Sequence, residues 1–148
     1  MKTLFICLIA FFSISTSAQL RTDCAPEEGP IYKLVEDMPH PDVGDLKSYT
    51  GLSRIATVQE YIQKHPDYMR LMSNINNNGT VQLTYTVGTK GCISNVLVRR
   101  ESHDGVGAVI ASILKTMPNW KPGKTLGSPV RVRQHIMVPY EGTSSLED

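Results

Sequence analysis

The last third of the chain most constrains the fold, because a helical pattern there passes through a turn into a long alternating segment. Apolar residues recur at the spacing of one helix face, at Val106, Val109, Ile110, Ile113, Leu114 and Met117. Pro118 ends this predicted helix, because proline has no N–H and cannot continue the backbone ladder. A helix with one apolar stripe must cover another element, and the alternation that follows predicts that this element is a sheet.

Residues 130–140 alternate between apolar and polar side chains, as a half-buried strand does. We predict that one face holds Val130, Val132, Ile136, Val138 and Tyr140, interrupted by Gln134. The opposite face holds Arg131, Arg133, His135 and Met137. Residues 80–87 show the same period with threonine and glutamine on the polar face. Residues 93–100 return after a glycine-flanked loop at 88–91, which predicts a hairpin.

Helices are predicted on both sides of this hairpin. Residues 53–65 place Ile55, Val58, Tyr61 and Ile62 on one face, with Ser53 as N-cap and Pro66 as the limit. Residues 67–73 add a short second turn, and Asp104 is the predicted N-cap of the later helix. The order is α-β-β-α-β. We therefore expect an α+β fold, with a three-stranded antiparallel sheet and helices packed on one face.

The first 18 residues have the pattern of a secretory signal peptide. Lys2 precedes an apolar run at 4–14, and small residues at 16–18 predict cleavage before Gln19. An uncleaved anchor is the alternative, but a spanning helix needs about 20 apolar residues. We expect a periplasmic or secreted protein with no stable membrane span after cleavage. Behind the signal we expect an irregular arm at 19–51, one domain at 52–141 and a polar tail at 142–148.

Charge gives no sign of a nucleic-acid partner. Loss of Lys2 with the signal lowers the Lys and Arg count from 15 to 14, equal to the 14 Asp and Glu. A chain without net charge has no field that favours nucleic acid or an anionic membrane surface. Partners of those two classes are therefore not predicted.

Two cysteines remain in the mature chain, because Cys7 leaves with the signal. In an exported protein, Cys24 and Cys92 can form a disulfide that ties the N-terminal arm to the hairpin loop. A closure this long contributes about 4 kcal/mol in the chain-entropy account. The alternative is two unrelated small side chains or a free thiol.

The turn after the late helix, Met117-Pro118-Asn119-Trp120-Lys121-Pro122-Gly123, and the strand opening Gly127-Ser128-Pro129-Val130-Arg131-Val132 resemble the C-terminal domain of TonB-type energy transducers. The resemblance covers about residues 61–140. Gly79-Thr80-Val81 and the Gly91 hairpin belong to it as weaker parts. Family members carry a transmembrane anchor and a Pro-rich spacer, which this sequence does not show. We therefore expect a stand-alone exported module of a Gram-negative bacterium, whose link to the inner-membrane proton motor is in doubt.

The resemblance implies a function as a protein-binding module in transport. In the family, the last strand pairs with a short N-terminal segment of outer-membrane receptors. Carried onto this chain, the partner-binding residues are Val130, Arg131, Val132, Arg133, Gln134, His135, Ile136, Met137 and Val138, with Trp120 in the preceding turn. The alternative is a self-associating assembly subunit, such as a homodimer formed through the same edge and without a role in energy transduction.

Two features of this surface have a second interpretation. Trp120 either anchors a partner or plugs the corner between sheet and helix. The arginines at 99, 100, 131 and 133 form either a solvated face or a surface that steers acidic peptides. Their sequence pattern alone does not separate these interpretations.

No catalytic or metal-binding motif is present in the sequence. His40, His65, His103 and His135 do not stand at metal-ligand spacing from one another or from a cysteine. Fingerprints of nucleophilic enzymes, P-loops and dinucleotide sites are lacking. We therefore predict no enzyme activity, no catalytic residues, no cofactor and no metal.

Overall fold

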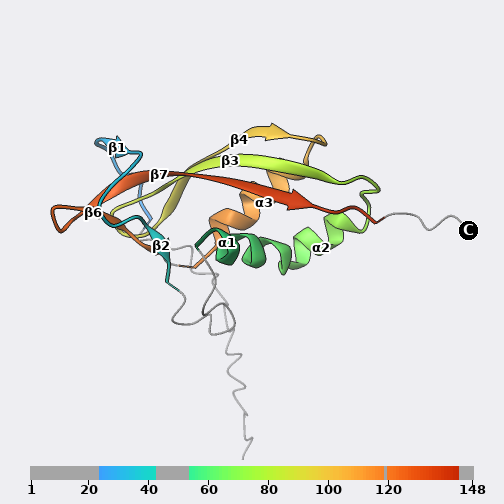
Figure 1. Cartoon of the computed structure of the whole chain (residues 1–148), viewed down its shortest axis with the longest axis horizontal. Coiled ribbons are helices and arrows are strands. Elements are labelled where there is room, and N and C mark those ends of the chain that lie inside the picture. Colours follow the sequence, from blue (N-terminus) through green and yellow to red (C-terminus); the bar gives the residue numbers. More distant parts are fainter. Residues whose placement is uncertain (1–23, 43–53, 119, 144–148) are drawn as a thin grey trace, which may run out of the picture.

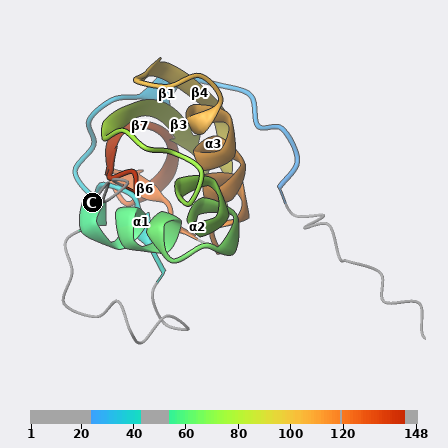
Figure 2. The same cartoon turned by 90° about the vertical axis from the view of Figure 1, so that its right-hand side faces the viewer.

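Helices and sheet form two layers. A computed structural model describes residues 24–42, 54–118 and 120–143. Its helices are α1 (Arg54–Gln63), α2 (Pro66–Met72) and α3 (Val106–Thr116). They lie on one side of a curled sheet (Figure 1). In the view of Figure 2, α1 and α2 lie beneath the strands and α3 lies at their right-hand side.

The sheet is built around one hairpin and the long final strand. The hairpin strands are β3 (Gly79–Val87) and β4 (Ile93–Glu101), and the final strand is β7 (Ser128–Tyr140). Short strands are β1 (Ile31–Tyr32), β2 (His40–Pro41), β5 (Trp120–Lys121) and β6 (Gly123–Thr125). The main sheet has the order β1-β7-β3-β4, β6 pairs with β7, and β2 and β5 form a separate ribbon.

The expected α+β class is confirmed, but the expected three-stranded antiparallel sheet is wrong in detail. β3 does pair antiparallel with both β4 and β7. The segment expected to be irregular also supplies β1, which pairs with β7 in parallel. Segments of two or three residues are too short to show a periodic pattern, so the pairing of the short strands was not predicted. The partners of β1 and β2 also lie far away in the sequence.

The core lies between the sheet and the helices. From β3 it receives alternate residues, including Val81 and Leu83, which are fully buried. The predicted stripe of α3 is confirmed, because all its members are buried except Val109, which packs partly against the core. On α1 the prediction fails at one position, since Ile55 remains 55% exposed. That residue lies beside the edge of β7, as described below.

The start of α3 differs from the prediction that Asp104 is its N-cap. Gly105 holds the cap position with φ 88°, a left-handed conformation that glycine adopts without steric cost. No side chain at that position accepts a hydrogen bond. Instead, Glu101 reaches from the end of β4 and accepts the N–H of Gly107 at 2.7 Å. The predicted cap Ser53 of α1 lies outside the described residues.

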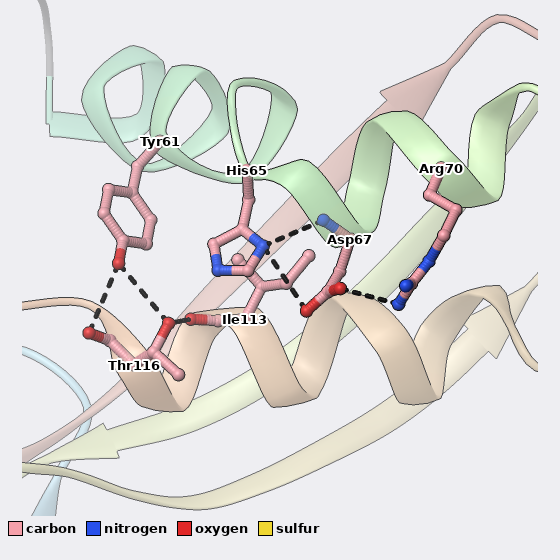
Figure 3. A network of polar contacts seen from close by, with 6 residues as sticks. All are labelled: Tyr61, His65, Asp67, Arg70, Ile113 and Thr116. Atoms are coloured by element: carbon pink, nitrogen blue, oxygen red, sulfur yellow. Dashed lines mark hydrogen bonds and ion pairs between the residues drawn. The ribbon is translucent and has the colours of Figure 1, made fainter. Parts of the chain in front are cut away.

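Polar contacts join the three helices (Figure 3). The hydroxyl of Tyr61 in α1 donates to the Thr116 carbonyl at the end of α3, at 3.2 Å. His65 is the N-cap of α2, and its Nδ1 accepts the N–H of Asp67 at 3.2 Å. Asp67 also pairs with Arg70 at 2.8 Å. His65 thus has a local structural role at a helix start.

Candidate binding edge of the sheet

The sheet has two long edges, and the one formed by β4 is distorted. Its register against β3 shifts twice, between Gln82 and Leu83 and between Thr84 and Thr86. Asn95 in β4 has φ 50°, as expected for a bulged residue. Bulges twist an edge away from a regular ladder and make it a poor template for another strand. β4 is therefore the weaker candidate for strand addition.

The β7 edge is regular, and the structure shows which of its backbone groups face outward. β3 and β7 pair without a register shift from Gly79↔Tyr140 to Val87↔Val132. In a strand, the N–H and C=O of one residue point to one side and those of the next residue to the other. Thr80 bonds to Ser102 on the β4 side, so its partner Pro139 points away from β3.

It follows that Arg133, His135, Met137 and Pro139 direct their backbone groups away from β3. Gln134 and the other even-numbered residues direct theirs into the ladder. Pro139 has no N–H, so it offers only a carbonyl. At the other end, β1 covers the edge by pairing Ile31 with Arg131 and Tyr32 with Val132. The bridge between Tyr32 and Val132 is parallel and the groups of Val132 face β3, so its hydrogen bonds come from the residues beside Val132 and occupy the N–H of Arg133. Among the described residues, the open edge therefore runs from the carbonyl of residue 133 to residue 139.

One acceptor on this edge is already used. Gln59 of α1 donates from Nε2 to the carbonyl oxygen of Met137 at 2.7 Å. This contact supports the outward assignment of Met137 independently of Thr80. An added strand would have to displace Gln59 to use that carbonyl. The backbone N–H groups of His135 and Met137 remain as the donors of the edge.

A cleft of about 320 Å³ lies beside the open edge. Its lining among the described residues comprises Met38, Arg54, Ile55, Tyr85, Gln134, His135 and Ile136. Tyr85 is 3% exposed, and burial raises its pKa well above the ordinary value, while Arg54 acts in the opposite direction. The Tyr85 hydroxyl therefore stays protonated at neutral pH and can donate a hydrogen bond.

The N-terminal arm is tied to the hairpin loop near this edge. Cys24 and Cys92 are joined by a disulfide with a Cα–Cα distance of 5.5 Å. Glu27 accepts the N–H of Thr89 at 2.8 Å. Burial alone would raise the pKa of Glu27, but hydrogen bonds from the 89–90 loop and the charge of Arg131 outweigh it, so the pKa is lowered. These contacts hold the arm in place as it leads into β1.

The structure separates the sequence-predicted partner residues into two faces. Three of them have side chains on the outer face: Arg133, His135 and Met137 are exposed. Val132, Ile136 and Val138 point into the core, and Val130 and Gln134 are half-buried. Arg131 is half-buried and donates to the Gly29 carbonyl at 2.8 Å. The backbone groups of the core-facing residues point into the ladder, and of these residues Ile136 also lines the cleft.

Trp120 lies inside the fold. It is 3% exposed and contacts the ring of Tyr85 edge-on, with centroids 5.6 Å apart. Its backbone N–H donates to the Gly91 carbonyl at 3.1 Å. This position matches the interpretation of Trp120 as a plug at the corner between sheet and helix.

Sequence reasoning missed the side chains that flank the edge from other elements, namely Gln59, Arg54 and Met38. Gln59 is separated from Met137 by 78 residues, and no local pattern connects them. Ile55 was the available sign of this cleft in the sequence, because it is an apolar residue of α1 that stays exposed while Val58 and Ile62 are buried.

Other classes of site find little support in the described part of the chain. No group of three or more His, Cys, Asp or Glu residues there could hold a metal ion. None of the described helices combines the length and apolar character needed to cross a membrane. The predicted signal peptide at 1–18 lies outside the described residues. The chain matches no protein-family model, no curated protein and no solved structure.

Proposed function

We propose that this chain is an exported protein-binding module, similar to the C-terminal domain of TonB-type transducers, and that β7 accepts an extended partner segment as an additional strand. The partner would be a segment of an outer-membrane transport receptor. The observation that carries this proposal is the regular, open edge from Arg133 to Pro139. An unpaired edge of this kind is a template for strand addition.

The edge also limits the partner. Its two open N–H groups, at His135 and Met137, stand at alternate residues between the outward carbonyls of Arg133 and Pro139, so the paired segment spans about five residues. Main-chain hydrogen bonds would supply much of the affinity, and alternate side chains would supply specificity. β1 bounds the segment on one side and Pro139 on the other.

Proline substitution tests the proposal, because proline removes one N–H. Partners are first captured from a periplasmic and outer-membrane extract with the exported chain. We expect His135→Pro to keep the fold by circular dichroism and to lose the partner. Gln134→Pro removes an N–H that points toward Tyr85 in the ladder, so it should lower the melting temperature. His135→Ala keeps the N–H and is the control for loss of the side chain.

Retention of the captured partner by folded His135→Pro would refute strand addition at β7. The alternative function, self-association through the same edge, is tested by the mass of the purified chain in solution. A tight dimer that His135→Pro converts to a monomer would favour the assembly subunit over the receptor-binding module.

A further inference from the structure

The cleft beside the β7 edge lies where a side chain of an added strand would enter. Gln134 and Ile136 line it from β7, and Tyr85 lines it from the next strand, β3. These three residues share the helix-facing side of the sheet. Met38 of the arm and Ile55 of α1 line the same cleft from other elements. A strand paired with β7 near His135 places every second side chain on this side, because side chains alternate between faces.

The polar groups of the cleft are suited to a carboxylate. Arg54 is its one permanent cation, and the protonated Tyr85 hydroxyl is a donor beside it. None of the described residues that line the cleft is acidic. Arg54 donates from Nη1 to the Pro39 carbonyl at 3.2 Å and, within the described chain, forms no ion pair. Its remaining guanidinium N–H groups are available to an acceptor.

Nearby acidic residues are held by other groups. Glu36 and Asp37 line a neighbouring cleft of about 630 Å³, which also contains Lys121 and Lys124. Glu36 accepts the N–H of Leu126 at 3.0 Å. Arg54 lines that cleft as well, and there the two lysines equal the two carboxylates in number.

The side chains on the opposite face of an added strand would also lie near basic residues. Arg133 and His135 are exposed there, and the β3 residues opposite them, Thr86 and Thr84, are uncharged. Arg99 of β4 lies on the same face, where its Nε donates to Thr84 at 3.0 Å. An extended partner at β7 would therefore have positive charge on both sides of its backbone.

We infer that the segment recognised by β7 is acidic, and that one of its carboxylate side chains enters the cleft between Met38 and Ile55 to bind Arg54 and the Tyr85 hydroxyl. This inference rests on the proposed function, since it names the chemistry of the partner at the same edge. Charge-assisted hydrogen bonds are stronger than neutral ones, which makes the carboxylate a determinant of specificity.

A displayed library of seven randomised residues, selected against the full exported chain, tests the inference. We expect selected peptides to carry Glu or Asp at alternate positions. The strongest peptide is then synthesised with its acidic residues unchanged, or replaced by Gln or by Lys. Binding measured by fluorescence anisotropy should weaken about tenfold for Gln at the cleft position, as for one charge-assisted hydrogen bond, and further for Lys.

Matched variants identify the cleft as the origin of this preference. Arg54→Gln should abolish the difference between the acidic and the Gln peptide, whereas Arg54→Lys should retain part of it. Arg133→Ala should leave the preference at the cleft position unchanged. Selected peptides that lack acidic residues but lose binding to His135→Pro would overturn the inference and leave strand addition intact. A library that yields no peptide dependent on the β7 edge would overturn both.

Discussion

Gln59 of α1 donates a hydrogen bond of 2.7 Å to the carbonyl oxygen of Met137 in β7, although the two residues are 78 positions apart. The contact covers one acceptor of an otherwise open strand edge. It therefore links the packing of α1 to the availability of β7. In the proposed function, Gln59 competes with the partner for this carbonyl.

We predict that Gln59→Ala lowers the free energy of unfolding by about 1 kcal/mol, as expected for one lost hydrogen bond at a partly exposed site. The same change should strengthen partner binding, because the Met137 carbonyl becomes free. Chemical denaturation and binding titration measure the two effects. Weaker partner binding by a folded Gln59→Ala protein would show that Gln59 supports the bound state instead.

The hairpin loop gives a second prediction. Gly91 has φ 76°, and a Cβ at this position would lie 1.8 Å from the Trp120 carbonyl oxygen. Gly91→Ala should therefore cost more than about 2 kcal/mol, through backbone strain and a clash with main chain that cannot move aside.

Gly127 is the matched control for this substitution. It has φ 75°, but a Cβ there meets no atom within 4 Å. Gly127→Ala should cost about 1 kcal/mol, which is the conformational term alone. Thermal unfolding of both variants gives the comparison. Equal losses would mean that the close approach to Trp120 contributes nothing.

Glu27 makes the attachment of the arm sensitive to acid. Its folded-state pKa lies below the ordinary value of 4.5, so its stabilising contribution is complete above that value and is lost as the pH falls through the folded-state pKa. Glu27→Gln should therefore be less stable than the parent at neutral pH, and this deficit should shrink as the pH falls below 4.5. Melting temperatures across this range test the sign. A deficit that persists unchanged at low pH would assign the effect to packing instead of charge.

Part of this architecture could be predicted from the sequence, because the periodic pattern of a long segment indicates which of its residues are buried. The stripe of α3 and the alternation of β3 and β7 are of this kind. The alternation also placed Arg133 and His135 on the exposed face of β7. Their backbone direction could not be predicted, since it depends on the register against β3 and not on side-chain pattern.

Other features depend on contacts between distant segments. β1 consists of two residues whose partner in β7 is about 100 positions away, so it has no local signature. Asp104 has the residue type of an N-cap, yet the acceptor used at the start of α3 is Glu101. The cleft combines the arm, α1 and two strands, and only the folded arrangement brings Arg54 and Tyr85 together.

Hydrogen exchange of individual backbone amides, measured by NMR with and without the captured partner segment, tests strand addition most directly. In the free protein, the amides of Gln134 and Ile136 should exchange slowly because they point into the ladder, whereas those of His135 and Met137 should exchange fast. The account predicts that the partner slows exchange at His135 and Met137 by about tenfold or more, with little change at β4. Unchanged exchange at these two amides in a saturated complex would contradict it.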